Sequence, residues 1–324
     1  MGINLLVTGG AGFIGSNLVE RFLDDERVDL VRVVDDLSTG YYENVVEFKG
    51  HPKYEFLKGD ICDLGVCTEA MQGINRVTHQ AALGSVPRSI DKPTRTNEVN
   101  VGGTVNILHA AQQAGVDRIV LAFSSSTYGD SKELPKVEDR IGRPLSPYAA
   151  SKYAAELYAE VFARTYGLDF VGLRYFNIFG PRQNADNPYA AVIPIFCKAF
   201  IEEIQPRIHG DGTTSRDFTF VENAVQANEL ALFSEDKAAL NQVYNVACGE
   251  QVSLNEMVDM LRKITGKNIQ AIHGPERPGD VKHSKADISK IRQRLGYEPG
   301  VRMYDGLQRV FEYYLEMYRV AKMY

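Results

Sequence analysis

The sequence predicts an α/β fold, in which a doubly wound parallel sheet is followed by a smaller α/β domain. Short apolar runs rich in β-branched residues alternate with stretches of helical spacing through the first half of the chain. This alternation indicates parallel strands joined by crossover helices. After residue 176 the apolar runs become shorter and less regular. We therefore expect one domain over residues 1–176, with a returning segment near 216–247, and a second domain over most of residues 177–324.

The elements of the first domain follow from the period of the apolar residues. Strands are expected at residues 3–8, 30–34, 54–57, 76–82, 118–123 and 170–175. Helices are expected at residues 13–24, 101–114 and 148–166. In the first helix, Ile14, Leu18 and Phe22 recur at the spacing of one helical face. Residues 177–189 hold two prolines, three asparagines and a glycine, which predicts a loop.

Two helices of the second domain have clear local signals. Ser253 and Glu256 form a capping box, in which each side chain hydrogen-bonds the backbone of the other residue. Apolar residues follow at helical spacing, so a helix is expected to begin there. The last helix of the chain has one apolar face, made of Leu307, Val310, Phe311, Tyr314, Leu315 and Tyr318.

The composition narrows the class of protein. The formal net charge is −6, so the chain offers no broad basic field for a nucleic-acid backbone. No apolar run approaches the roughly 20 residues that cross a bilayer, and no signal peptide is recognisable at the start. The four cysteines form no Cys-x-x-Cys pair and no metal-ligand spacing. We expect a cytoplasmic protein with reduced thiols, and with no metal, nucleic-acid or membrane partner.

A glycine-rich turn follows the first expected strand. Gly9, Gly12 and Gly15 recur at intervals of three residues, between that strand and the first helix. The first glycine permits a tight turn, the second lets the backbone approach a pyrophosphate, and the third lets helix and strand pack closely. The helix that follows offers free N–H groups to phosphate oxygens. The turn therefore predicts a Rossmann-like domain that binds a dinucleotide.

An acidic pair indicates which dinucleotide binds. Asp35 lies 20 residues after Gly15, at the end of the second expected strand, and Asp36 follows it. A carboxylate at this point accepts hydrogen bonds from ribose hydroxyls and repels a 2′-phosphate, which favours NAD over NADP. Asp35 could instead be an ordinary turn residue at a strand end. The glycines that precede it favour the cofactor role.

Tyr148 and Lys152 form a candidate catalytic pair. They lie four residues apart on an expected helix and so share one face. Free tyrosine has a pKa of about 10 and is a poor base at neutral pH. A nearby ammonium favours the phenolate and lowers that pKa, so the pair could act as a general acid and base. A solvated helix face is the alternative, but the polar run of residues 124–127, at the carboxyl end of a parallel strand, favours a site.

Motifs along the whole chain resemble the nucleotide-sugar branch of the extended short-chain dehydrogenase/reductase family. The resemblance implies bound NAD, a UDP-sugar substrate and a homodimer, with the dimer formed through the helices at 101–114 and 148–166. The matching segments are TGGAGFIG at 8–15, GDI at 59–61, HQAA at 79–82, YAASK at 148–152, RYFNIFGPRQ at 174–183, RDFTFVEN at 216–223 and RPGDVKHS at 277–284.

The resemblance also implies roles for individual residues. The catalytic residues would be Ser124, Tyr148 and Lys152. The cofactor contacts would be Gly9, Gly12, Phe13, Ile14, Gly15, Asp35, Asp36, Asp60, Ile61, Ala82, Asn100, Tyr148, Lys152 and Tyr175. The substrate contacts would be Ser85, Ser125, Ser126, Asn177, Val192, His209, Arg216, Arg277, Asp280 and Ser284. The two arginines suit a diphosphate, because guanidinium presents a bidentate fork to phosphate oxygens.

The residues after Ser124 separate the reactions of the branch. Its 4,6-dehydratases carry an Asp-Glu pair at the positions of Ser125 and Ser126, and its decarboxylases carry Glu at the second of them. Two serines therefore favour 4-epimerisation, in which C4 is oxidised and then reduced on its other face. A net dehydrogenase that exchanges NAD with solvent, and a regulator that senses dinucleotides without catalysis, are the alternatives.

The substrate expectation depends on Ser284. The likeness is greatest to bacterial UDP-N-acetylglucosamine 4-epimerases of surface-polysaccharide pathways. Epimerases restricted to UDP-glucose carry a tyrosine at the position of Ser284, and a serine leaves room for a 2-acetamido group. The resemblance thus implies interconversion of UDP-N-acetylglucosamine and UDP-N-acetylgalactosamine. The corresponding uronate, UDP-N-acetylglucosaminuronate, and UDP-glucose remain alternative substrates.

Overall fold

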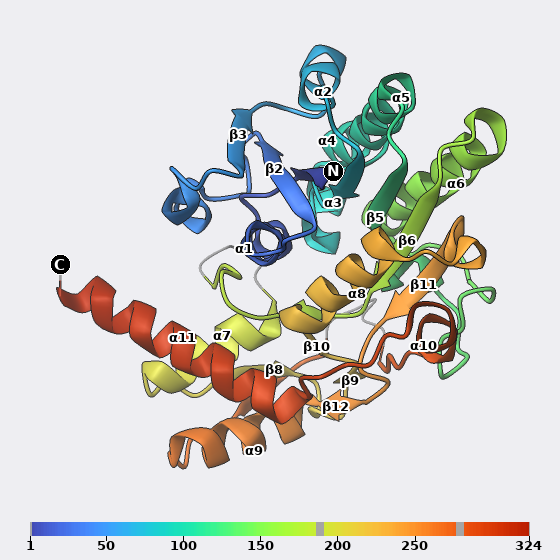
Figure 1. Ribbon diagram of the computed structural model, residues 1–324. Helices are drawn as coiled ribbons and strands as arrows, with labels where there is room; N and C mark the ends of the chain where they lie inside the picture. Colours follow the sequence, from blue (N-terminus) through green and yellow to red (C-terminus); the bar gives the residue numbers. More distant parts are fainter. Residues whose placement is uncertain (1, 186–190, 277–281, 324) are drawn as a thin grey trace.

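A seven-stranded parallel sheet forms the centre of the computed structural model, which describes residues 2–185, 191–276 and 282–323 (Figure 1). The strand order is β11-β6-β5-β4-β1-β2-β3, and every neighbouring pair is parallel. The order reverses between β1 and β4, which is where open sheets of this type bind ligands. The strands are β1 (Ile3–Thr8), β2 (Val28–Asp35), β3 (Tyr54–Lys58), β4 (Arg76–His79), β5 (Arg118–Ser124), β6 (Phe170–Tyr175) and β11 (Gln242–Val246).

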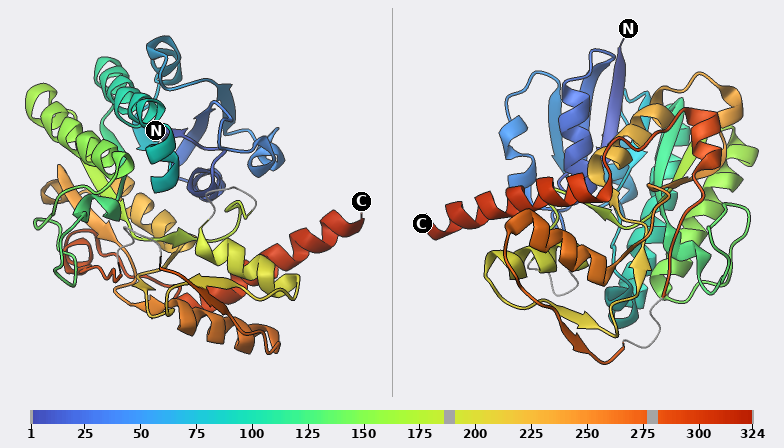
Figure 2. Two further views of the ribbon diagram at one scale, coloured as in Figure 1. Left: turned by 180° about the vertical axis from the view of Figure 1, so that it is seen from behind. Right: turned by 90° about the horizontal axis from the view of Figure 1, so that it is seen from below.

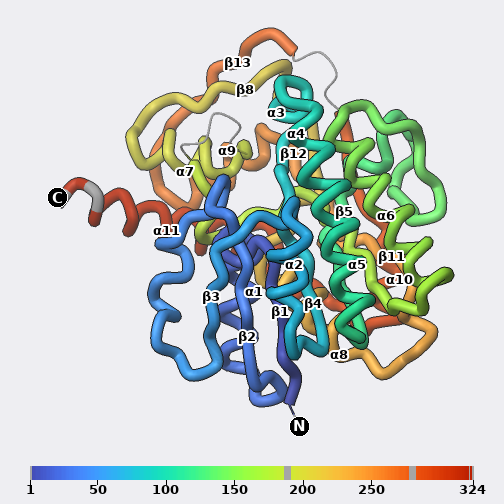
Figure 3. Tube along the Cα trace, turned by 90° about the horizontal axis from the view of Figure 1, so that it is seen from above, coloured from blue at the N-terminus to red at the C-terminus, as the bar shows by residue number. Residues whose placement is uncertain are grey.

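Helices cover both faces of this sheet, and each face has its own apolar core. Leu5 and Val7 of β1 pack into one core, whereas Leu6 packs into the other, because successive side chains of a strand point to opposite faces. The first core is closed by α1 (Phe13–Leu23), α8 (Val221–Phe233) and α10 (Ser289–Leu295). The second is closed by α2 (Leu64–Ala70), α5 (Thr104–Ala114) and α6 (Pro147–Tyr166), which lie side by side in Figure 3.

The C-terminal part packs against the carboxyl ends of the strands. Its separate apolar core joins α7 (Val192–Ile201), α9 (Leu254–Thr265) and α11 (Met303–Met323). The last turns of α11 project from the body of the molecule (Figure 2). Its short strands are β7 (Ile178–Phe179), β8 (Arg207–His209), β9 (Ser215–Arg216), β10 (Thr219–Phe220), β12 (Val252–Ser253) and β13 (Ile272–Gly274).

Local sequence patterns predicted the exact bounds of some elements. Strands 3–8 and 170–175 have the predicted bounds, and the capping box of Ser253 and Glu256 is formed in full. The expected helix 101–114 instead begins as a π-helical turn over Glu98–Gly103 and becomes α-helical at Thr104. The short helices α3 (Val86–Asp91) and α4 (Pro93–Asn97) were not predicted, although each has a proline in its first turn.

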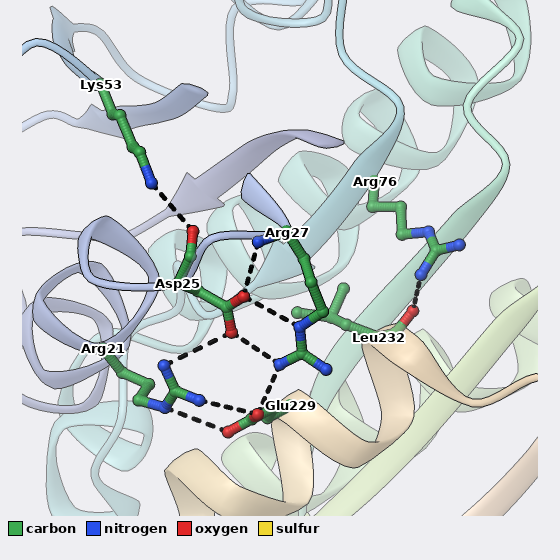
Figure 4. A network of polar contacts seen from close by, with 7 residues as sticks. All are labelled: Arg21, Asp25, Arg27, Lys53, Arg76, Glu229 and Leu232. Carbon is green, nitrogen blue, oxygen red and sulfur yellow. Dashed lines mark hydrogen bonds and ion pairs between the residues drawn. The ribbon is translucent and has the colours of Figure 1, made fainter. Parts of the chain in front are cut away.

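The amino edge of the sheet is fastened by a network of charged side chains that joins α1 to α8 (Figure 4). Arg27 holds the Asp25 carboxylate with two nitrogens, at 2.8 and 2.6 Å. Arg21 donates to both carboxylate oxygens of Glu229 on α8, at 3.1 and 2.8 Å. Asp25 is buried, so the network contributes to the packing of α1 against α8. Within the described ranges, no helix combines the length and apolar character that crossing a membrane requires.

Candidate active site

A cleft of about 1230 Å³ runs along the carboxyl ends of the central strands, facing the C-terminal part of the chain. The glycine turn, Asp35 and Ser124 lie at this edge, at the carboxyl ends of β1, β2 and β5. Most of the predicted site residues line the cleft, although they come from segments far apart in the sequence. These are Gly9, Gly12, Phe13, Ile14, Gly15, Asp35, Asp36, Asp60, Ile61, Ala82, Ser85, Ser124, Ser125, Ser126, Tyr148, Lys152, Tyr175, Asn177, Arg216 and Ser284.

The glycine turn forms a tight cradle at the start of α1. Gly9 has a φ of +66°, which favours glycine, and a Cβ there would lie 2.7 Å from Cα of Ala81. A Cβ on Gly15 would lie only 2.1 Å from the carbonyl oxygen of Gly9. Gly12 precedes α1 and provides no side-chain cap, so the first N–H groups of the helix have no such partner. These features fit the pyrophosphate of a dinucleotide.

Asp35 connects β2 to this cradle. Its Oδ2 accepts a hydrogen bond from the backbone N–H of Ala11 at 3.0 Å, and its Oδ1 accepts one from Leu37 at 2.8 Å. Burial raises the pKa of the Asp35 carboxyl, and the two backbone hydrogen bonds oppose that change. Each carboxylate oxygen keeps a further lone pair, as ribose binding requires. Asp36 accepts hydrogen bonds from Ser38 and so shapes the adjoining loop.

Asp60 lies farther along the same wall and is held by a second charged contact. Its Oδ2 lies 2.9 Å from Nη2 of Arg95, and its Oδ1 accepts from the backbone N–H of Cys62 at 2.8 Å. Burial tends to raise the pKa of this carboxyl, but the hydrogen bonds from Cys62 and Arg95 lower it overall. The charged Asp60 therefore fixes the segment that brings Ile61 to the cleft.

Ser124, Tyr148 and Lys152 meet at the centre of the cleft. Ser124 ends β5, while Tyr148 and Lys152 lie in the first turns of α6, which Ser146 caps by accepting from the N–H of Ala149 at 3.1 Å. The Ser124 side chain lies near enough to the Tyr148 phenol to lower its pKa against the effect of burial. Lys152 is buried, and its Nζ donates to the carbonyl oxygen of Ala122 at 2.9 Å. This geometry places a phenol, a hydroxyl and an amine within one short segment of the cleft.

The predicted direction of the Tyr148 pKa shift is wrong for this structure. Burial raises the pKa of Tyr148, and only the Ser124 side chain opposes this change. The Lys152 Nζ instead donates to the carbonyl oxygen of Ala122 at 2.9 Å, and Lys152 is not among the groups that act on the pKa of Tyr148. Burial also lowers the pKa of Lys152 to about 8, against the opposing charge of Glu156.

The end of the cleft beside Ser124 is lined by small hydroxyl groups. Ser125 and Ser126 follow Ser124 in a short 3₁₀ turn, and both line the cleft. The backbone N–H of Ser126 donates to Oγ of Ser124 at 3.1 Å, whereas Oγ of Ser126 is buried and has no partner among the described residues. Both positions after Ser124, at which the resemblance implies carboxyl groups in dehydratases, thus carry hydroxyls.

Backbone pairing brings the C-terminal residues of the site to the cleft. The N–H of Ser284 donates to the carbonyl oxygen of Ser215 at 3.1 Å, which places Ser284 beside β9 and Arg216. On the floor of the cleft, Tyr175 accepts at its hydroxyl from Nδ2 of Asn228 at 2.7 Å. Asn177 donates through Nδ2 to the carbonyl oxygen of Asp217 at 3.1 Å. Segments of both parts of the chain therefore form one continuous wall.

Three predicted site residues do not line the cleft. Asn100 is buried behind it, where Oδ1 accepts from the N–H of Leu83 at 2.8 Å and Nδ2 donates to Oγ of Ser151 at 3.0 Å. Val192 begins α7 and His209 ends β8, and neither reaches the cleft. The hydrogen bond from Leu83 means that Asn100 supports the cleft wall from behind. Arg277 and Asp280 lie outside the described residues.

The structure adds residues to the cleft that the sequence did not single out. Gln80 and Gln183 line it, and both lie within motifs quoted above, so their motif positions could have indicated them. Lys136 also lines it and is buried. No local pattern marks Lys136, because a backbone bridge to Ala286, far along the chain, places it there.

Comparisons with known proteins agree with this geometry. The model of the NAD dependent epimerase/dehydratase family matches residues 5–247. The UDP-glucose 4-epimerase of Mycolicibacterium smegmatis is 37% identical over 313 residues, which cover 95% of this chain and 97% of the relative.

Two solved structures have nearly the same fold. A UDP-N-acetylglucosamine 4-epimerase from Methanobrevibacter ruminantium M1, in complex with UDP-N-acetylmuramic acid, has a TM-score of 0.92 at 36% identity, covering 98% of this chain and 99% of that one. A UDP-glucuronic acid 4-epimerase from Bacillus cereus, in complex with UDP-glucuronic acid and NAD, has a TM-score of 0.89 at 30% identity, covering 98% of this chain and 100% of that one. The glycine cradle, the cleft and these matches together show that the chain is an NAD-dependent enzyme and belongs to the NAD dependent epimerase/dehydratase family.

Proposed function

We propose that this enzyme interconverts UDP-N-acetylglucosamine and UDP-N-acetylgalactosamine by inverting the configuration at C4. The comparisons support the broader activity, NAD-dependent 4-epimerisation of a UDP-sugar. The observation that carries the proposal is the arrangement around Ser124. Tyr148 and Lys152 lie beside it for proton transfer, while the next two positions carry hydroxyls instead of carboxyl groups. The site can thus serve oxidation and reduction at C4 but lacks an acid at these positions for expelling a C6 hydroxyl.

Tyr148 is the group placed to move the proton of the sugar 4-hydroxyl. The Ser124 side chain lies close enough to act on the pKa of the phenol, and Lys152 lies one turn farther along α6. Lys152 can promote the phenolate by exchanging the carbonyl of Ala122 for the phenol, because a nearby positive charge lowers a tyrosine pKa. The glycine cradle and Asp35 would hold NAD, which would supply the acceptor and donor of the C4 hydride. Tyr148 then gives the proton back to the 4-oxygen after the 4-keto sugar has turned over in the cleft.

The choice of an N-acetylated sugar rests on small side chains that line the cleft. Ser284 lines the cleft beside β9, and Ser126 has a buried hydroxyl with no partner among the described residues. A 2-acetamido group needs both space and hydrogen-bonding groups, because an unpaired buried amide costs free energy. The similarity to the Methanobrevibacter ruminantium enzyme supports the same choice.

The test is incubation of the purified protein, without added NAD, with UDP-N-acetylglucosamine, UDP-glucose and UDP-N-acetylglucosaminuronate separately. Chromatography should show that the N-acetylglucosamine compound is converted to its C4 epimer with the highest kcat/KM. Turnover of only the uronate or only the glucose compound would contradict the proposed substrate. Stoichiometric consumption of externally added NAD would instead identify a net dehydrogenase.

We also propose that the enzyme is a homodimer. Leu157, Tyr158 and Val161 are exposed along one side of α6. Exposed apolar residues grouped on one helix face are typical of association surfaces. Light scattering should give twice the mass of the chain, and Leu157→Lys combined with Val161→Lys should shift it to the monomer. A monomeric wild-type protein at micromolar concentration would contradict the proposal.

A further inference from the structure

A buried layer of polar side chains lies behind Tyr148 and Lys152 and has no part in the reaction as proposed above. Glu156 follows Lys152 by four positions on α6, so Tyr148, Lys152 and Glu156 succeed one another along one face of the helix. Glu156 is 2% exposed, and Arg174 of β6 is 4% exposed. Two opposite charges are therefore buried one helical turn behind the reacting groups.

Glu156 and Arg174 form a bidentate ion pair. Nε of Arg174 donates to Oε1 of Glu156 at 3.0 Å, and Nη2 donates to Oε2 at 2.7 Å. Oγ1 of Thr127 donates to Oε1 of Glu156 at 3.2 Å. The remaining nitrogen, Nη1 of Arg174, donates to the carbonyl oxygen of Glu138 at 2.8 Å and to the hydroxyl of Tyr128 at 3.2 Å. The paired groups thus have hydrogen-bond partners on all sides.

The ion pair joins three elements that form the centre of the cleft. Thr127 belongs to the 3₁₀ turn that carries Ser125 and Ser126. Arg174 directly precedes Tyr175 on the cleft floor, at the end of β6. Glu156 belongs to the helix that carries the catalytic pair. A change in the ion pair would therefore move all three sets of cleft residues relative to one another.

Stability alone does not account for this arrangement. Removing two charges from water is costly, and a buried ion pair is often no more stabilising than apolar side chains of the same size. Apolar side chains would lack two features of this pair. They could not form the two-point hydrogen bonding between Arg174 and Glu156, and they would place no negative charge near Lys152. That charge acts on Lys152, because Glu156 is the group that opposes the effect of burial on its pKa.

The other groups around Lys152 do not supply this charge. His79 of β4 is neutral, because burial lowers its pKa to about 3. Tyr148, one turn before Lys152 on α6, is a protonated phenol, since burial raises its pKa. Ser124 of β5 carries no charge, and Arg174 of β6 is positive. Burial raises the pKa of Glu156, and the hydrogen bonds and charge of Arg174 oppose that change. Among the described residues, Glu156 is the group whose negative charge opposes the effect of burial on the pKa of Lys152.

We infer that Glu156, fixed by Arg174, is a positioning residue for the proposed epimerase reaction: it sets the placement of Tyr148 and Lys152 against Ser124 and holds a carboxylate one helical turn from the Lys152 amine. The inference rests on the proposed role of Tyr148 and Lys152 in proton transfer. It assigns to Glu156 and Arg174 a role in kcat and not in substrate affinity, since neither lines the cleft.

The first test is Glu156→Gln, which keeps the size of the side chain and removes its charge. We expect kcat to fall about 10- to 100-fold, the size of loss that misplacement of reacting groups produces, with KM within about threefold of wild type. The alkaline limb of the kcat profile should move to lower pH by about one unit, because a negative charge that favoured the ammonium is gone. Glu160→Gln is the matched control, since Glu160 lies one turn farther along α6, is exposed and pairs with Arg164.

The second test separates positioning from packing and still applies if Glu156→Gln does not fold. Glu156→Leu combined with Arg174→Met replaces the pair with apolar side chains of similar size, so the fold should remain as stable as wild type or become more stable. We expect this folded double variant to keep the lowered kcat and the shifted pH profile. Wild-type kcat and pH dependence in either variant would overturn the inference.

A measurement without turnover distinguishes this inference from the proposed function. In protein labelled with ¹³C-lysine, the Cε resonance of Lys152, assigned by its loss in Lys152→Arg, reports its titration directly by NMR. The Lys152 midpoint should be lower in Glu156→Gln than in wild type and unchanged in Glu160→Gln. If wild type epimerises no UDP-sugar, the proposed function fails, yet this titration still decides the action of Glu156 on Lys152. An unchanged midpoint in Glu156→Gln would overturn that action.

Discussion

At the scale of single residues, the chemistry of the site depends on burial as much as on residue type. Tyr148 has a raised pKa because it lies among protein atoms, and Lys152 has a lowered one for the same reason. Burial therefore moves the two pKa values in opposite directions. In each case it favours the neutral form of the side chain, the phenol of Tyr148 and the amine of Lys152. A hydroxyl at Ser124 and a carboxylate at Glu156 counteract these changes, one for each member of the pair.

Tyr148→Phe tests the proton-transfer role most directly. It removes the hydroxyl and keeps the ring, so the cleft should retain its shape. General acid and base groups contribute typically about 10²- to 10⁴-fold, and we expect kcat to fall by at least the lower value with KM largely kept. Steady-state kinetics measure both. Tyr166→Phe, at the exposed end of the same helix, should have no effect. A Tyr148→Phe enzyme within threefold of wild type would refute the assignment.

Ser284→Tyr tests the basis of substrate choice. A tyrosine would fill the space that an acetamido group needs, and packed protein does not stretch to admit it. We expect turnover of UDP-N-acetylglucosamine to fall much more than any turnover of UDP-glucose. The measurement is the ratio of the two kcat/KM values in a folded protein that retains NAD. If that ratio does not change, Ser284 does not border the 2-acetamido group.

At the scale of elements, the carboxyl and amino ends of the strands differ in the groups that surround them. The carboxyl ends of the strands form the cleft, where glycine turns and a short 3₁₀ turn leave polar groups facing it. The amino ends are fastened by ion pairs between α1 and α8, with Lys53 donating to the carbonyl of Asp25 at 2.9 Å and Arg76 donating to that of Leu232 (Figure 4). Charged side chains at this edge stabilise packing at the end of the sheet opposite the cleft.

Asp25→Asn should reveal this stabilisation through its pH dependence. Hydrogen bonds from Arg27, which outweigh burial, lower the pKa of Asp25 from 3.8 to about 2. A carboxyl with a lowered pKa stabilises the fold above its unfolded pKa, and the stabilisation is lost as pH falls through the folded value. The shift corresponds to about 2 kcal/mol at neutral pH.

Urea denaturation measures the difference between wild type and Asp25→Asn. The difference in unfolding free energy should be largest at pH 7 and should shrink by roughly half at about pH 3. A difference that does not vary between these conditions would show that the Asp25 charge does not contribute. Asp24→Asn, at the neighbouring exposed position, serves as the control.

At the scale of the whole molecule, the two parts of the chain share one cleft. Residues of the glycine turn and residues as distant as Ser284 line the same space. Because NAD is regenerated in each epimerisation, the enzyme has no need to release it between turnovers. A cleft enclosed by both parts suits a cofactor that stays bound.

Tight retention of NAD is the corresponding prediction. Denatured pure protein should release NAD, at about one molecule per chain, because the cofactor takes part without net consumption. Gly15→Ala should abolish retention, since its Cβ would lie 2.1 Å from the carbonyl oxygen of Gly9. Gly300→Ala is the control, because nothing lies within 4 Å of the added Cβ. Release of NADP, or of no nucleotide across preparations, would contradict the prediction.

The sequence alone determined those features that depend on neighbours in the chain. The glycine spacing predicted the cradle before α1, because Gly12 and Gly15 meet the backbone of Gly9 only a few residues away, whereas the contact of Gly9 with Ala81 depends on the fold. The interval of four placed Tyr148 and Lys152 on one helix face, and Ser253 with Glu256 marked the start of α9. The division into domains near residue 176 and the roles of the site residues stay predictions.

Tertiary structure alone decided whatever depends on contacts between distant segments. It placed Asn100 behind the cleft, because the amide groups of that side chain hydrogen-bond Leu83 and Ser151. It brought Lys136 to the cleft through Ala286, and it paired Glu156 with Arg174 across α6 and β6. It also fixed the direction of the Tyr148 pKa shift, since desolvation is set by everything that packs around the phenol. Local spacing can show which side chains share a helix face, but the free energy of burying them depends on the whole fold.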